Sequence, residues 1–349
     1  MTADAITMIR SGPYTSVQDR GRAGHQAVGV PESGALDRVA LRLGNALVGN
    51  PADRAGLEIC LGGVQIAFQA SRRVALTGSV AATMVITDHL GHDITVYANR
   101  SIRVHAGQTI HINGLSGTNT VFLAISGGIG TPPLYSSRAT SPNAMIGGLK
   151  GRLLKDGDVL PLCPDVAFPD TAKGYAAKGY ADKMLSDLTV YDASSSIRVV
   201  FGPQDDRFTD QAKTVFLSST YQVSPLLNRM GMRLDGPVLE HCDNADIASD
   251  GIVNGSVQVP GDGKPIILLA DHQTTGGYTK IATVIQADLP MLARRKPGDS
   301  ITFTAISVED AEQAARDHEA LLCHAIETMV APPPMNAIAS PCPSDDKSD

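Results

Sequence analysis

The sequence contains no tryptophan, few aromatic residues and no long apolar run. Aromatic residues make up only 4% of its 349 residues. A membrane-spanning helix needs roughly 18 or more apolar residues in succession, and no window of this sequence approaches that length. The N-terminal residues also lack the apolar stretch of a signal peptide. These absences argue against a membrane-spanning class and predict a cytoplasmic protein with no membrane partner.

Clusters of basic residues and paired cysteines are equally scarce. Binding to nucleic acid phosphates requires clustered Lys and Arg, whereas the formal net charge is −7 and the longest basic run is 294–296. The five cysteines are scattered without C-x-x-C spacing, which predicts reduced thiols rather than disulfides or a structural zinc site. We therefore expect no nucleic acid partner and no metal.

Standard catalytic motifs are absent as well. The sequence has no G-x-G-x-x-G after an expected strand, no G-x-x-x-x-G-K-[ST], no H-E-x-x-H and no G-x-S-x-G. Standard motifs therefore assign no function to this chain. The overall pattern alone indicates a β-rich protein with two domains.

Glycine and proline are abundant, with 34 and 21 residues respectively. Short apolar runs alternate with turn residues such as Gly62-Gly63 and Asn113-Gly114. The expected strands lie at 64–68, 74–77, 83–87, 94–97, 101–104, 109–112 and 121–125, and then at 198–201, 256–259, 265–270, 281–285 and 300–304. Short strands separated by frequent turns are typical of a barrel or a sandwich.

Apolar residues at helical spacing predict three helices, at 36–47, 206–217 and 309–330. Asp37 lies at the start of the first helix and Gly49 follows its end, as expected of helix caps.

The expected domain organisation follows from these patterns. An N-terminal β domain covers 6–163, and a polar stretch at 164–196 is interpreted as a linker or mobile loop. A C-terminal β domain covers 197–306, a helix follows at 307–330, and the tail at 331–349 is expected to be disordered.

Several longer segments resemble one known family. They read GPYTSVQDRGR (12–22), GVPESGALD (29–37), LEICLGG (57–63), NRMGMRLDGP (228–237), SDGI (249–252), QVP (258–260) and DHQTTGGYTKI (271–281). Together they are similar to the urea-amidolyase-related family, also called allophanate hydrolase subunit 2. Its members include the carboxyltransferase portion of urea carboxylase, the KipA-type proteins and the C subunit of 5-oxoprolinase. The resemblance covers roughly residues 8–305.

The resemblance implies a mainly β chain of two cyclophilin-like β-barrel domains with a few short helices. The function it implies first is the C subunit of an ATP-dependent 5-oxoprolinase, which opens 5-oxoproline to glutamate together with its A and KipI-like B subunits. One alternative is a biotin-dependent carboxyltransferase component acting on urea or a related amide. Another is a non-catalytic regulator that binds a KipI-like kinase inhibitor.

Opening a lactam requires donors that face developing negative charge and a carboxylate that orients water. The segment 273–278 combines hydroxyls, a primary amide and two glycines, whose backbone N–H groups can approach a ligand closely. The catalytic candidates are Asp250, Asp271, Gln273 and Lys280. The substrate-binding candidates are Arg229, Gln258, Thr274, Thr275, Gly276, Gly277, Tyr278, Gln18, Asp19, Ser33 and Asp37.

Several of these candidates also have a purely structural interpretation. Arg229 could bind a carboxylate of the substrate or of carboxybiotin, or it could pair with a local acid such as Asp235. Asp250 could orient water or simply form an Asp-Gly turn, and Gln258 could donate into the site or close a turn. Asp37 could help to bind an anion near a helix N-terminus or could cap that helix.

Three further features bear on the site. Glu58 lies in an apolar strand, so it belongs to a buried ion pair or to the catalytic groups. Gln18, Asp19 and Arg22 form a polar cluster among glycines. His272 stands where a longer basic side chain is expected in the family. The hypothesis as a whole expects the loops near Asp37 and near Gly276-Gly277 to face a common crevice.

Overall fold

The computed structural model describes residues 4–165, 182–191, 194 and 196–332. Most of the predicted linker and nearly all of the predicted C-terminal tail lie outside the described residues. None of the helices within the described ranges is long and apolar enough to cross a membrane.

The first half of the chain forms two antiparallel sheets. Its strands are β1 (Ala5–Ser11), β2 (Tyr14–Gln18), β3 (Gly56–Cys60), β4 (Val64–Phe68), β5 (Arg72–Thr77), β6 (Thr83–Thr87), β7 (Asp93–Tyr97), β8 (Ser101–Val104), β9 (Thr109–Ile112), β10 (Thr120–Ile125) and β11 (Val159–Pro161). One sheet has the order β11-β1-β4-β9-β6-β7 and the other β2-β3-β10-β5-β8.

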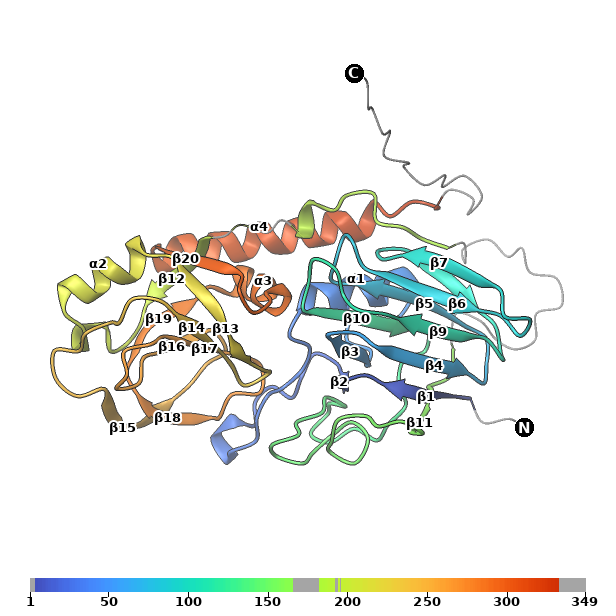
Figure 1. Ribbon diagram of the computed structural model, residues 1–349, viewed down its shortest axis with the longest axis horizontal. Helices are drawn as coiled ribbons and strands as arrows, with labels where there is room; N and C mark the ends of the chain where they lie inside the picture. The colour runs from blue at the N-terminus through green and yellow to red at the C-terminus, as the bar shows by residue number, and fades with distance from the viewer. Residues whose placement is uncertain (1–3, 166–181, 192–193, 195, 333–349) are drawn as a thin grey trace, which may run out of the picture.

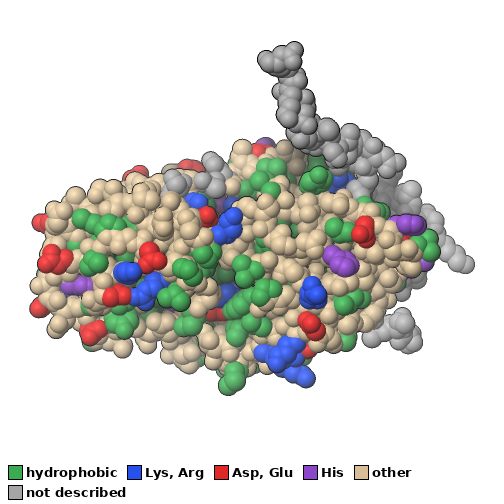
Figure 2. Space-filling view, viewed as in Figure 1, with side chains coloured by type: hydrophobic (Ala, Val, Ile, Leu, Met, Phe, Trp, Pro, Cys, Tyr) green, Lys and Arg blue, Asp and Glu red, His purple; other side chains and the backbone are tan. Residues whose placement is uncertain are grey.

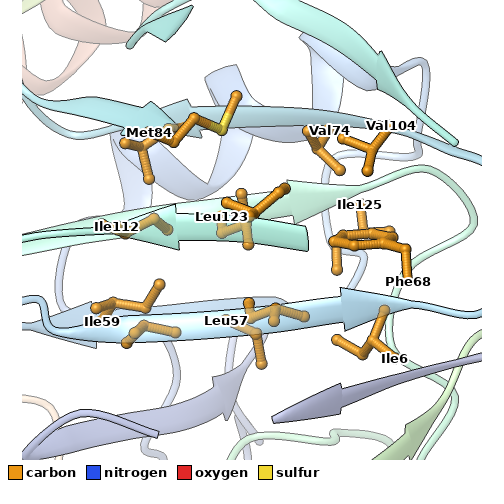
Figure 3. Packing of buried hydrophobic residues seen from close by; sticks show 14 of the residues in the cluster. Ile6, Leu57, Ile59, Phe68, Val74, Met84, Val104, Ile112, Leu123 and Ile125 are labelled. Carbon is orange, nitrogen blue, oxygen red and sulfur yellow. The ribbon is translucent and has the colours of Figure 1, made fainter. Parts of the chain in front are cut away.

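The core of this half lies between the two sheets, as Figure 3 shows. Because successive side chains of a strand point to opposite faces, Leu57 and Ile59 of β3 enter this core beside Leu123 of β10. Glu58 and Cys60 of the same strand must then point to the outer face of the five-stranded sheet. The period of two thus places a carboxylate on the side that the rest of the chain covers.

The helix α1 (Arg38–Val48) covers one part of that outer face. Its apolar side packs on Ala75, Phe122 and Ala124 of the sheet. Asp37 caps the helix by accepting a hydrogen bond from Ala40 N at 2.9 Å, and Gly49 ends it in the left-handed conformation. The predicted helix and both of its caps are confirmed. Another part of the outer face, at Glu58 of β3, meets the second half of the chain.

The second half is a closed barrel of seven strands in the order β12-β19-β16-β17-β14-β13-β20. These strands are β12 (Ser196–Phe201), β13 (Tyr221–Leu227), β14 (Gly231–Asp235), β16 (Ser256–Gln258), β17 (Ile266–Leu268), β19 (Lys280–Val284) and β20 (Ser300–Ala305). The strands β15 (Asp246–Gly251) and β18 (Thr275–Tyr278) form a separate two-stranded sheet. A second hydrophobic core fills the barrel.

Three further α-helices are found among the described residues. The helix predicted at 206–217 is observed as α2 (Asp210–Ser218), which begins later because Thr209 caps it by accepting from Ala212 N. The short helix α3 (Leu289–Arg294) was not predicted. The predicted last helix is observed as α4 (Val308–Glu327), and Figure 1 shows it lying along both halves.

The expectation of a mainly β chain with few helices is confirmed. The second half is the closed barrel that was expected, while the described strands of the first half form two facing sheets. Figure 1 shows the barrel beside the two sheets, and the halves meet where Arg229 contacts Glu58 of β3 and Gly34 in the segment before α1.

Candidate active site

The contact between the halves centres on a buried ion-pair cluster. Arg229 donates from Nη1 to Glu58 Oε1, and its Nε lies 2.8 Å from Asp271 Oδ2. Its Nη2 donates to Gly34 O at 2.6 Å and to Asp271 Oδ1 at 3.1 Å. The second oxygen of Glu58 accepts from Leu36 N at 2.7 Å. The contacts of Arg229 with Glu58 and Gly34 therefore join the two halves of the chain. Its contacts with Asp271 fix the loop that carries this residue.

Electrostatics explains why these three side chains are buried together. The ion-pairing side chains of Arg229, Glu58 and Asp271 are each only 2% exposed. Burial opposes the charge of Arg229, but Asp271 and Glu58 outweigh it and hold its pKa above the ordinary value. A buried ion that loses its partner is strongly destabilising, so the cluster must form as a unit.

This geometry gives Arg229 and Asp271 a structural role. From the sequence, Arg229 was a substrate-binding candidate with a structural alternative, and Asp271 was a catalytic candidate. The structural interpretation of Arg229 named Asp235 as its partner, but Asp235 pairs with Lys264 at 2.8 Å instead. The carboxylate of Asp271, a catalytic candidate, is engaged by Arg229. Glu58 is the residue that the candidate set lacked, and the available signal was its place in an apolar strand.

A second polar group lies where β15 meets β18. Lys280 Nζ donates to Asp250 Oδ2 at 2.9 Å, and Gln204 Nε2 donates to the same oxygen at 3.3 Å. Asp250 is opposite Gly276 in the β15–β18 pair. The Lys280 side chain is 3% exposed and that of Asp250 is 51% exposed, so the pair leads from the protein interior to solvent. The pKa of Asp250 is lowered, first of all by the hydrogen bond from Lys280.

Gln258 and Gly276 form a small cradle beside this pair. Gln258 lies opposite Lys280 in the β16–β19 pair. Its Nε2 is buried and has no hydrogen-bond partner among the described residues. A Cβ atom at Gly276 would lie 2.8 Å from that nitrogen and 2.6 Å from Ile252 Cδ1. The absence of a side chain at Gly276 therefore leaves space next to Gln258 Nε2, a donor for which the described residues offer no acceptor.

The remaining candidates of 273–278 surround the cradle. Gln273, Thr275 and Tyr278 are exposed, and Thr274 uses its carbonyl to accept from Ile252 N at 3.1 Å. The structure thus brings together Asp250, Gln258, Gly276 and Lys280, with the other residues of β18 at their edge. Gly277 differs from Gly276, because the nearest atom to an added Cβ there would be Ile247 O at 3.4 Å.

The N-terminal candidates lie on the first half, at the end of β2 and in the segment that follows it. Asp19 accepts from Ser137 Oγ at 2.6 Å and from Gly21 N at 2.9 Å, so its carboxylate holds the surrounding loops. Gln18 donates from Nε2 to Ser16 Oγ and Thr140 O, both at 3.0 Å, while its Oε1 has no partner among the described residues.

Ser33 resembles Gln18 in having an unused polar atom. Its backbone has a positive φ of 55°, which is uncommon for a residue with a side chain. Its buried Oγ has no hydrogen-bond partner within the described ranges. Both residues were substrate-binding candidates, and both offer a buried polar atom to a ligand.

Asp37 belongs to a different contact between the halves. Besides capping α1, it accepts from Arg294 Nε of α3 at 2.7 Å. The guanidinium of Arg294 also lies 4.6 Å from the ring centroid of Tyr191. Asp37 is 2% exposed, and its carboxylate is engaged by these contacts, which favours the structural interpretation. Among the described residues, no hydrogen bond or ion pair joins Asp37 to Gly276-Gly277. The common crevice that was expected for these two segments therefore stays a prediction.

A small cavity lies between the halves, close to Arg229. It has a volume of about 160 Å³ and a mostly apolar wall that includes Tyr14, Leu36, Cys60 and Leu269. Burial raises the pKa of Tyr14 to about 12 and that of Cys60 to about 12, so both groups stay protonated at neutral pH. On the face shown in Figure 2, the junction of the halves is hollowed, with basic and acidic side chains within it.

Comparison with known proteins identifies relatives over most of the chain. The family model for the carboxyltransferase domain, subdomain A and B, matches residues 28–305. The chain is 37% identical over 314 residues to the C subunit of 5-oxoprolinase from Escherichia coli (strain K12), a match that covers 90% of this chain and 95% of that protein. It is 33% identical over 341 residues to urea amidolyase of Lachancea kluyveri, which covers 93% of this chain and 18% of that protein.

A solved structure supports the same relationship. The crystal structure of the K. lactis urea amidolyase superimposes with a TM-score of 0.81 at 26% sequence identity. The match covers 93% of this chain and 20% of that chain, so this protein spans about a fifth of that enzyme. The architecture of two halves is therefore shared with a part of a much larger protein.

Proposed function

Because the chain belongs to the family of carboxyltransferase domains with subdomains A and B, we propose that it is the C subunit of an ATP-dependent 5-oxoprolinase. In this role it contributes to the opening of 5-oxoproline to glutamate. The observation that carries the proposal is coverage in both directions. The match spans 95% of a protein named as a separate subunit, whereas it spans 18% of a urea amidolyase.

A second candidate function is biotin-dependent carboxyl transfer to urea or a related amide. It is favoured by the description of the matching family and by the 33% identity to a urea amidolyase. In that reaction a carboxylated biotin would deliver its carboxylate to an amide nitrogen. Biotin carboxylation and the biotin carrier would come from other chains.

The polar cradle supplies groups that suit either reaction. The unpartnered Nε2 of Gln258 and the backbone beside Gly276 are donors for an amide oxygen on which negative charge develops. Lys280 keeps Asp250 ionised and in place at the rim, where that carboxylate can orient water. Gln273, Thr275 and Tyr278 would contact the bound amide from the exposed side. Gln18 and Ser33 would contact it from the first half.

ATP supplies activation in the proposed complex, because phosphorylation of the amide oxygen makes the carbonyl a better electrophile. In this chain, Lys280 and the Gly276-Gly277 backbone are groups of the kind that anionic oxygens bind. Their work in the proposal is to bind and orient the amide and to exclude water until the carbonyl is activated.

The proposed partners are the other two components of such an enzyme, its A subunit together with the KipI-like B subunit. Relatives that are named as the C subunit of 5-oxoprolinase support a complex of several different chains. We expect little activity from the isolated chain, because the proposed reaction is completed only in the complex.

The test is to purify this chain with and without the products of its neighbouring genes and to measure ATP-dependent glutamate release from 5-oxoproline. We expect release from the complete set and little from this chain alone. Urea with bicarbonate, in the presence of a biotin carboxylase and a biotin carrier, serves as the second assay. Carboxylation of urea without glutamate release would reject the 5-oxoprolinase proposal in favour of the second candidate.

A further inference from the structure

Arg22 is a buried cation with an unused donor. The residue is 1% exposed and lies in the loop that follows β2. Its Nε donates to Leu134 O at 3.5 Å, and its Nη2 donates to Ala139 O. Its Nη1 is buried and has no hydrogen-bond partner in the part of the chain that the structure describes.

Arg22 also lacks an ion-pair partner within the described ranges. The acidic side chains whose charge reaches it are Asp19 and Asp271. Asp19 is engaged by Gly21 N and Ser137 Oγ, and Asp271 is engaged by Arg229. Burial lowers the pKa of Arg22, and these two carboxylates only partly offset that effect. A buried charge normally has a counter-ion in contact, which here is missing from the described protein itself.

The guanidinium is held firmly in this position. A Cβ atom at Gly147 would lie 2.4 Å from Arg22 Nη2, so the chain passes directly against the side chain. The backbone N of Arg22 also donates to Glu32 O at 2.8 Å, which fixes the start of the side chain. An unpaired cation that is fixed on both sides is organised to receive a ligand rather than to move toward solvent.

Two other side chains with unpartnered polar atoms either lie next in the chain to a hydrogen-bond partner of Arg22 or donate to a residue that does. Ser33 follows Glu32, whose carbonyl accepts from Arg22 N, and its Oγ is free to donate. Gln18 donates to Thr140 O, next in the chain to the carbonyl that accepts from Arg22, and its Oε1 is free to accept. The first half therefore contains a buried cation, a hydroxyl and an amide oxygen that the described residues leave unused.

We propose that Arg22 binds a carboxylate carried by the amide substrate, with Ser33 Oγ as a second donor and Gln18 Oε1 accepting from the amide N–H. This inference rests on the proposed function and adds a requirement to it. The carboxylate and the N–H must lie on adjacent atoms, as they do in 5-oxoproline, whereas urea is neutral and has no carboxylate. Arg22 is then the residue that selects an anionic amide over a neutral one.

The test compares two ligands that differ only in the carboxylate. The full chain, alone and in the complex with its partner subunits, is titrated calorimetrically with 5-oxoproline and with 2-pyrrolidinone, which has the same ring without the carboxylate. Arg22→Gln should weaken the binding of 5-oxoproline by about 10- to 100-fold, because a hydrogen-bonded contact to a charged group is lost. Binding of 2-pyrrolidinone should be weak in the wild type and unchanged in the variant.

Two further variants separate binding from folding. Ser33→Ala removes a hydroxyl that has no partner in the described protein, so it should weaken 5-oxoproline binding without lowering the melting temperature. Arg233→Gln is the matched control, because that arginine lies in a partly exposed pair with Asp262 and should leave binding unchanged. Arg22→Lys retains the charge and should bind 5-oxoproline more tightly than Arg22→Gln.

Each alternative outcome has a defined meaning. Equal weakening of both ligands with a lower melting temperature would assign Arg22 a structural role and overturn the inference. So would an Arg22→Gln complex that keeps its KM for 5-oxoproline but loses carboxylation of urea, since the bound carboxylate would then be that of the carboxylated cofactor. If the wild-type complex releases glutamate and Arg22→Gln leaves the KM for 5-oxoproline unchanged, this inference alone is rejected. A wild-type complex that neither binds 5-oxoproline nor releases glutamate rejects the proposed function as well.

Discussion

Replacing Arg229 by methionine should destabilise the protein more than any other single substitution at the contact between the halves. The substitution removes the only cation in contact with the buried carboxylates of Glu58 and Asp271 among the described ion pairs. It also removes the donor to Gly34 O. Breaking a buried ion pair by deleting one partner typically costs about 3–5 kcal/mol, because a charge is left buried and uncompensated.

The loss of stability can be divided between the contributions of Arg229 and Glu58 by comparing single and double variants. Glu58→Gln keeps an oxygen that can accept from Leu36 N and removes only the charge, so it should cost less than Arg229→Met. The double variant should be less destabilised than the sum of the two single variants, since the second change removes a charge that the first left unpaired. We expect a coupling free energy of about 1–3 kcal/mol from this cycle.

The assay is equilibrium unfolding in urea, followed by a probe in each half. The control is Arg233→Met, whose pair with Asp262 is partly exposed and should contribute about 1 kcal/mol or less. Because Arg229 connects the two halves, its loss should also separate the unfolding transitions of the two cores. If Arg229→Met costs no more than Arg233→Met and the transitions stay coincident, the cluster does not hold the halves together and the reasoning is wrong.

The remaining predictions concern the cradle and the second contact between the halves. Gly276→Ala should lower the activity of the complex by about 10-fold or more, because its Cβ would crowd Gln258 Nε2 and Ile252. Gly277→Ala is the control and should have a small effect. Similar kcat/KM values for the two variants would contradict the role of the cradle. Lys280→Met should lower kcat/KM and return the pKa of Asp250 toward its ordinary value, which NMR titration of the carboxyl group measures. Because the pKa of Asp250 is depressed, its ionised pair with Lys280 is present above the unfolded pKa and is lost only as pH falls through the lower folded value. Its titration should therefore produce no break in the activity profile between about pH 5 and 8. Asp37→Asn should retain the cap on α1 but lose the charge that pairs with Arg294, so its loss of stability should be smaller than that of Asp37→Ala by about 1 kcal/mol in thermal unfolding.

Local patterns predicted much of the fold and part of the site. The helix α1 was predicted with both caps, since Asp37 and Gly49 act on the backbone within a few residues of themselves. Strands such as β4, β6 and β9 were predicted for a similar reason, because the period of two is a property of adjacent residues, whereas β1, β13 and β14 were not predicted. By contrast, α2 begins four residues later than predicted, since Thr209 rather than the apolar spacing determines where its first turn closes.

The site shows the same division. Gly276 and Lys280 were named from the sequence because polar residues and glycines lie close together in the segment around them. Gln258 was named because it lies on a short strand and could donate into the same site. Arg229 was named too, but its partners could not be, since Glu58 is 171 positions away along the chain. Arg22 was seen as part of a polar cluster, and only its burial without a counter-ion distinguishes it from an ordinary surface arginine.

The sequence by itself determined the strand-rich pattern, the caps of α1 and the family to which the chain belongs. These features depend on residue types at short spacing and on segments that keep their order. Only the tertiary structure decided which charges neutralise one another and which polar atoms are left unused. That outcome depends on burial and on contacts between the two halves, because a charge is costly only where water is excluded and its counter-ion can come from anywhere in the chain.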